Sequence, residues 1–183
     1  MKKLIIGFTI LEIAVSISLF SIAILLTGSM YIISQRTYNK GRDQGELIQN
    51  VRVVFDRITR ELRQSVEMVT DLPDSEGSAI AEILFQAGHD TDQITYLKYN
   101  LEGTNLKRYH IAYEFSSELG TYVTYDSTEG GLTPNVRTLS GKVIGEYFAD
   151  LNFWESEGLV NYSVSLEKGQ ETIDISSMVT SRN

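Results

Sequence analysis

The longest uninterrupted apolar run in the chain lies near its N-terminus. From Ile13 to Ile33 no side chain is charged and no residue is proline. A helix of about 21 residues is roughly 32 Å long, which matches the hydrocarbon core of a bilayer. A helix that is apolar on every face rarely fits inside a domain of this size. The pattern therefore predicts a membrane-spanning helix, to which we assign residues 8–33.

The following segment becomes polar but keeps a helical period. Across residues 34–70, apolar side chains recur at steps of three and four, which predicts an amphipathic helix. Pro73 and Gly77 then indicate a loop, so we expect the helix to end near residue 70. The apolar stripe should supply the helix side of a core through Leu47, Val51, Phe55, Ile58 and Leu62.

Residues 71–183 show the alternation of apolar and polar side chains that is typical of strands. Two hairpins are expected, one turning at Gly103 and one at Gly158. Since the stripe of the helix needs an apolar partner and the strands need a cover on one face, the sequence predicts an α+β fold with the helix packed on an antiparallel sheet. We expect strands at residues 81–85, 94–101, 106–115, 122–125, 143–154, 159–167 and 172–179.

Composition and charge exclude several classes of function. The 183 residues contain no cysteine, which excludes a disulfide scaffold, a thiolate zinc site, an iron–sulfur cluster and a cysteine nucleophile. The net charge is −8, and it is unevenly distributed. From Met68 onward, seven Lys and Arg stand against 18 Asp and Glu, a balance of −11. Such an acidic head repels phosphate, so we expect no nucleic-acid partner.

Glu12 is the one acidic residue next to the apolar run. A carboxylate in a lipid-facing helix costs on the order of 3 kcal/mol near the bilayer centre and less towards its ends. It therefore either has a partner or lies at the interface in water. A cleaved secretory signal explains the segment poorly, because the apolar run is long and Arg36 follows it in place of a small-residue cleavage site.

The residues around Glu12 carry a family resemblance. Lys2 and Lys3 precede the segment Gly7-Phe8-Thr9-Ile10-Leu11-Glu12, and the apolar helix follows directly. This pattern resembles the processing motif of type IV pilins and pseudopilins. The resemblance implies that residues 1–7 are a leader and that prepilin peptidase cuts between Gly7 and Phe8. It further implies N-methylation of Phe8 and a role for Glu12 as the carboxylate required for assembly. The fold it implies is pilin-like, a long helix on an antiparallel sheet.

A second resemblance narrows the subgroup. The segment from Val51 to Gln64 is similar to the end of the helix in the J-type minor pseudopilin of type II secretion and in the W-type minor pilin of type IV pili. It implies a minor subunit at or near the tip of a filament, where it primes assembly. The implied partners are other minor and major pilins, the prepilin peptidase, the inner-membrane assembly platform and, before assembly, membrane lipid. The chain would cross the inner membrane once, with its head outside the cytoplasm, and then join a periplasmic or cell-surface filament.

Candidate chemistry in the head is sparse. His89 and His110 are the only histidines, and no third ligand for zinc accompanies either. The acidic residues Asp90 and Asp92 offer oxygen atoms, but acidic surface loops are common, so we expect neither a metal nor another cofactor. No nucleophile motif is present, and we expect no enzyme activity.

One alternative from another class stays open. The helix could merely tether an extracytoplasmic head that binds a ligand or adheres to a surface, without entering a filament. Processing at Gly7 distinguishes the two hypotheses, because a simple signal anchor keeps its N-terminal residues.

Overall fold

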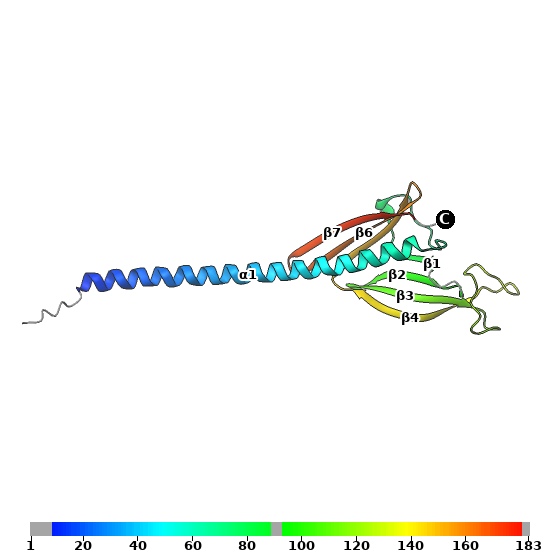
Figure 1. The fold of residues 1–183 in the computed structure, drawn as a ribbon, viewed down its shortest axis with the longest axis horizontal. Coiled ribbons are helices and arrows are strands. Elements are labelled where there is room, and N and C mark those ends of the chain that lie inside the picture. The colour runs from blue at the N-terminus through cyan, green and yellow to red at the C-terminus, as the bar shows by residue number, and fades with distance from the viewer. Residues whose placement is uncertain (1–8, 89–92, 181–183) are drawn as a thin grey trace, which may run out of the picture. The chain divides into compact units, whose positions relative to one another are not determined.

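The computed structural model describes residues 9–88 and 93–180, and within them it contains one long helix and two antiparallel sheets (Figure 1). Helix α1 spans Ile10–Arg63, and a short 3₁₀ helix, η1, spans Glu76–Ser78. The chain divides into two compact units, one up to Arg42 and one from Asp43 onward. The α+β class predicted from the sequence is confirmed, although two sheets replace the expected one.

The first sheet has four strands in the order β1-β2-β3-β4, and the second has three in the order β5-β6-β7. Every neighbouring pair is antiparallel and follows directly along the chain, so each sheet is a simple meander. The strands are β1 Glu82–Gln86, β2 Tyr96–Glu102, β3 Asn105–Glu114, β4 Asn135–Gly145, β5 Phe148–Ser156, β6 Leu159–Lys168 and β7 Glu171–Val179.

The core of the second unit joins α1 to both sheets. The buried side chains of the helix pack in one cluster with Phe85 and Tyr99 of the first sheet and with Phe153 and Tyr162 of the second. Phe55 is only half-buried, and its ring lies 4.8 Å from that of Tyr162. The fully or almost fully buried residues of α1 are Leu47, Val51, Val54, Ile58 and Leu62. Val54 thus occupies the central position that the sequence interpretation gave to Phe55.

Helix α1 ends at Arg63, about two turns before the predicted end near residue 70. Gly88, two residues after β1, lies close against the end of the helix: a Cβ added to it would lie 1.9 Å from the carbonyl oxygen of Gln64. The chain then runs beside β1 instead, and the Val66 and Val69 amides donate to the carbonyls of Gln86 and Leu84. This pairing also covers an edge of β1 that would otherwise be open.

The predicted strand 143–154 is wrong, because the chain changes sheets within it. Strand β4 ends at Gly145 and β5 begins at Phe148, with Tyr147 between them at φ 69°. A Cβ on Gly145 would lie 2.5 Å from the Phe148 ring and 2.8 Å from Val54, so only glycine fits where the two sheets and the helix meet.

Two further strand predictions fail in the segment between β3 and β4. Residues 135–142 were not predicted as a strand, yet they form most of β4; all are exposed except Leu139 and Ser140, which are half-buried neighbours, so burial does not alternate along the strand. The strand expected at residues 122–125 is reduced to a single bridge between Val123 and Tyr113. Serine, threonine and glycine dominate this stretch, and they give no periodic signal.

We expect a chain beginning at Arg36 to be soluble and folded, because the compact unit from Asp43 contains the whole core. In this chain Ile58→Ala should lower the free energy of unfolding by about 2–5 kcal/mol, since Ile58 is fully buried. Ile48 lies on the same helix and is 51% exposed, so Ile48→Ala is a matched control that should cost little. Urea denaturation measures both, and equal effects would show that this stripe does not form the core.

Candidate functional site

The N-terminal part of α1 is suited to an apolar environment. Among the described residues, α1 is the helix that is long and apolar enough to cross a membrane, and its apolar window is wholly exposed. Of the six residues from Ile10 to Ile33 that carry a hydroxyl group, four donate it to a backbone carbonyl three or four residues earlier at 2.8 Å. These four hydroxyls need no water, which suits the segment to lipid or to a surface of other apolar helices. The residues are Ser18, Ser21, Thr27 and Ser29.

Glu12 has a partner within its own helix. The carboxylate accepts hydrogen bonds from the Thr9 amide at 2.8 Å and from the Thr9 hydroxyl at 3.0 Å. The Glu12 amide in turn donates to the Thr9 hydroxyl oxygen at 3.2 Å. Since α1 begins at Ile10, Thr9 is the residue before the first turn and Glu12 closes that turn, so the pair forms a capping box.

Sequence reasoning missed Thr9. It looked for the partner of Glu12 in another subunit or in interfacial water, although Thr-x-x-Glu ahead of an apolar run is itself a recognised signal for the start of a helix. The capping box satisfies backbone donors that would otherwise be orphaned at the helix end. The predicted cleavage and methylation residues, Gly7 and Phe8, lie outside the described residues, as do the leader residues 1–7.

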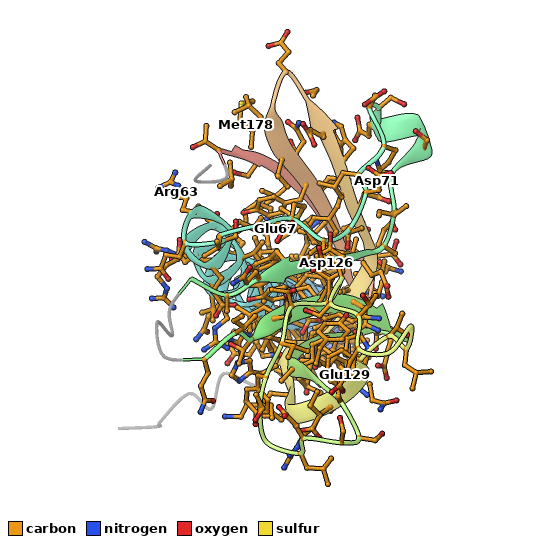
Figure 2. The ribbon with its side chains drawn as sticks, turned by 90° about the vertical axis from the view of Figure 1, so that its right-hand side faces the viewer. Arg63, Glu67, Asp71, Asp126, Glu129 and Met178 are labelled. Atoms are coloured by element: carbon orange, nitrogen blue, oxygen red, sulfur yellow. The ribbon has the colours of Figure 1, made fainter. Side chains whose placement is uncertain are left out.

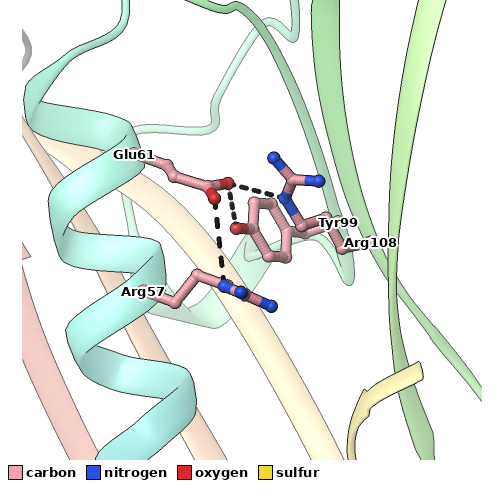
Figure 3. A network of polar contacts seen from close by, with 4 residues as sticks. All are labelled: Arg57, Glu61, Tyr99 and Arg108. Atoms are coloured by element: carbon pink, nitrogen blue, oxygen red, sulfur yellow. Dashed lines mark hydrogen bonds and ion pairs between the residues drawn. The ribbon is translucent and has the colours of Figure 1, made fainter. Parts of the chain in front are cut away.

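A second polar site ties the end of α1 to the first sheet (Figure 3). The Glu61 carboxylate accepts a hydrogen bond from the Tyr99 hydroxyl of β2 and one from Arg108 Nε of β3 at 2.9 Å. Arg57 Nε lies 4.0 Å from the other carboxylate oxygen. The Glu61 side chain is only 13% exposed, so these donors compensate a charge that has largely left water. The arrangement holds the helix on the sheet.

The titration of Tyr99 reflects this burial. Removal from water raises the pKa of its phenol well above the ordinary value, and the adjacent Glu61 carboxylate raises it further. The phenol therefore stays protonated and keeps donating to Glu61. Tyr96, Tyr113 and Tyr162 also have raised pKa values, in each case chiefly because of burial.

The end of the head at which α1 stops carries many carboxylates. Figure 2 shows Glu67 and Asp71, from the segment after the helix, together with Asp126 and Glu129 of the long connection between β3 and β4. Arg63, in the last turn of α1, is also seen in this view. The acidic head predicted from the sequence thus presents an acidic end to solvent.

No metal site forms in residues 9–88 and 93–180, where no three His, Asp or Glu side chains lie together as ligands would. His110 lies on β3 opposite Ser140 of β4. The acidic loop with His89, Asp90 and Asp92 lies outside the described residues.

Comparison with known proteins yields no relative. No family model matches the chain, none of the curated proteins is similar to it, and no solved structure resembles it. Its function therefore has to be argued from its own residues and their geometry.

Raising the pH above about 10 should unfold the soluble chain progressively. In the unfolded chain the Tyr99 phenol has its ordinary pKa of 10.0 and loses its proton above pH 10. In the folded chain the pKa is higher and the phenol stays protonated. The free energy of unfolding therefore falls as the pH rises above 10. Each such tyrosine contributes up to about 1.4 kcal/mol per pH unit to the slope of the free energy of unfolding against pH.

Tyr99→Phe should reduce this slope by that amount, as measured by urea denaturation at several pH values. Tyr38→Phe, which removes a hydroxyl from a residue that is 70% exposed, is the control. Equal slopes for Tyr99→Phe and the unaltered chain would contradict the assignment.

Proposed function

We propose that this chain is a subunit of the type IV pilin and pseudopilin class, a structural protein without enzyme activity. Prepilin peptidase removes residues 1–7, the new N-terminal Phe8 is methylated, and the mature chain waits in the inner membrane with its head outside the cytoplasm. The assembly platform then moves it into a filament of other minor and major subunits.

One observation carries this proposal: a lone carboxylate, Glu12, lies five residues after Gly7 and directly before the exposed, uncharged stretch of α1 from Ile13 to Ile33. A filament of this class packs such helices against one another, which removes their apolar side chains from lipid. The hydroxyls of Ser18, Ser21 and Thr27 fit that surrounding, since each donates to a backbone carbonyl of its own helix and needs no water. The α+β head with α1 in its core supports the same class, because a pilin-like subunit has this layout.

In the filament, the Glu12 carboxylate pairs with the amine of Phe8 from a neighbouring subunit. Both charges would be costly alone in an apolar bundle, and together they offset each other. The Thr9 bonds to Glu12 occupy part of the carboxylate, which has acceptor sites left for an ammonium group.

The subunit belongs near the tip of the filament and in few copies. Its similarity to the J-type pseudopilin and the W-type pilin favours this place, and so does its charge. Heads with a balance of −11 from Met68 onward would repel one another if they were packed side by side along a shaft. A single copy among other minor subunits avoids this repulsion and can cap the first turn of the filament, which primes assembly.

The capping box also gives the rival hypothesis its best support. If Thr9 is the sole partner of the Glu12 carboxylate, the carboxylate stabilises the start of the helix and needs no contact with a second subunit. The chain would then be an anchored extracytoplasmic binding protein. A filament subunit needs a negative charge at residue 12, whereas an anchored binding protein needs only a hydrogen-bond acceptor there.

Three substitutions distinguish the two hypotheses. Glu12→Gln keeps an acceptor for the Thr9 amide but removes the charge, whereas Thr9→Ala removes the hydroxyl of the cap and leaves the carboxylate. We expect Glu12→Gln and Glu12→Ala to reduce incorporation into filaments by about tenfold or more, since an unpaired amine in the bundle costs more than the 1.4 kcal/mol that corresponds to tenfold. Thr9→Ala should assemble almost normally. Immunoblotting of sheared filaments against the membrane fraction gives the ratio.

The opposite ranking would contradict the proposal. If Glu12→Gln assembles normally while Thr9→Ala and Glu12→Ala do not, residue 12 acts only as a helix cap. Processing of each variant, followed by its mass, controls for an effect on the peptidase.

A further inference from the structure

Strand β4 is an outer strand of the first sheet, and no described residue covers its free edge (Figure 1). The chain itself covers the outer edges of two other strands, because residues 66–70 bond to β1 and Ile80 pairs with Phe153 of β5. Among residues 9–88 and 93–180, by contrast, β4 pairs with β3 alone. Its 11 residues therefore offer backbone donors and acceptors to which another extended chain can add.

The side of β4 that faces the helix carries its two cations. Lys142 lies opposite Arg108, whose guanidinium bonds to α1, so both side chains are on the helix side of the sheet. Arg137 lies opposite Ala112, which is four residues after Arg108 on β3 and so faces the same way. Lys142 is exposed and forms no ion pair with a described residue. Arg137 bonds to Glu114 through Nη1, and its side chain is still 51% exposed.

The outward side of β4 is mainly apolar. Val136 lies opposite Tyr113 and Val143 opposite Lys107, and because side chains alternate along β3, both lie on the face away from α1. Val136 is 59% exposed and Val143 is 49% exposed. A strand added to β4 would place its own side chains beside these two, so apolar residues at those positions would bury area that is now in water.

The cations of β4 contrast with the rest of the head. From Met68 onward the charge balance is −11, yet β4 contains Arg137 and Lys142 and no Asp or Glu. The edge is thus a local positive site on an acidic protein. Such a site favours an acidic partner and disfavours a basic one, because opposite charges across an interface attract and like charges repel.

A second copy of the chain is a poor occupant of this edge. Two β4 edges would bring like charges together, and the two register shifts between β3 and β4 further limit edge-to-edge pairing. Strand β7 of a second copy also matches poorly, since its acidic residues Glu171 and Asp174 lie three positions apart and hence on opposite faces. Two heads that each carry −11 would repel one another as well.

We propose that the edge of β4 binds an extended acidic segment of another protein, which adds to the first sheet as a further strand. In that segment Asp or Glu alternates with apolar residues. The carboxylates face Lys142 and Arg137 on the helix side, and the apolar side chains pack beside Val136 and Val143 on the outward side. Backbone hydrogen bonds to β4 supply affinity, and the alternation supplies specificity. The inference does not rest on the proposed function, because it uses residues of the head alone.

Binding of a model peptide to the full chain in a non-ionic detergent tests the proposal. The probe is a blocked, fluorescently labelled peptide of about eight residues in which Glu alternates with Val or Thr. Fluorescence anisotropy should give a Kd on the order of 0.1 mM that weakens at high salt. Hydrogen exchange of the backbone amides should slow in residues 135–145 when the peptide binds and stay unchanged in β7.

Two control peptides and two variants separate strand addition from general attraction. A peptide with Lys in place of Glu, and a Glu peptide with N-methylated amides that cannot donate to β4, should each bind about tenfold more weakly or not at all. Lys142→Glu should weaken binding of the Glu peptide by about tenfold or more. Arg52→Glu makes the same change of charge at an exposed position of α1 and should bind as the unaltered chain does. Circular dichroism shows whether each variant is folded.

Four results would overturn the proposal. The first is absence of binding by the Glu peptide. The second is equal binding by the N-methylated peptide, which would show a charge contact without strand addition. The third is equal binding by folded Lys142→Glu, which would place the peptide elsewhere. The fourth is slower exchange in residues 135–145 when the chain alone is concentrated, which would assign the edge to a second copy.

Discussion

Burial of the apolar stripe of helix α1 joins the two sheets into one folded head. A sheet of three strands and a sheet of four strands each have one apolar face, and neither face can be covered by its own loops. The stripe from Leu47 to Leu62 packs in one cluster with both faces, so the same side chains close two cores at once. Gly145 lets the chain cross from one sheet to the other directly beside Val54. The Glu61 site adds a charged contact in the last turns of the helix, next to Leu62 at the end of the apolar stripe.

The parts of this fold that repeat regularly could be predicted from the sequence. The stripe of α1 and the hairpin that turns at Gly158 follow from periods of 3.6 and two residues. Strand β4 could not be predicted, because burial does not alternate along a strand that is exposed over most of its length. The early end of α1 has no local signal either, and the contact that Gln64 makes there with Gly88 exists only in the folded chain. A change of sheet within an apolar stretch likewise has no local signal.

The candidate sites divide in the same way. The long apolar helix is evident from composition, and the capping box of Thr9 and Glu12 is also encoded locally, by a Thr-x-x-Glu segment ahead of the apolar run. The Glu61 site combines residues from α1, β2 and β3, so no spacing in the sequence reveals it.

The measurement that tests the central claim most directly is the intact mass of the native protein, combined with sequencing of its N-terminus. The account predicts a chain that begins at Phe8 with a methylated amine and therefore lacks Lys2 and Lys3. A mature protein that still carries both lysines, or one that is cleaved beyond the apolar segment near Ser34, would contradict it.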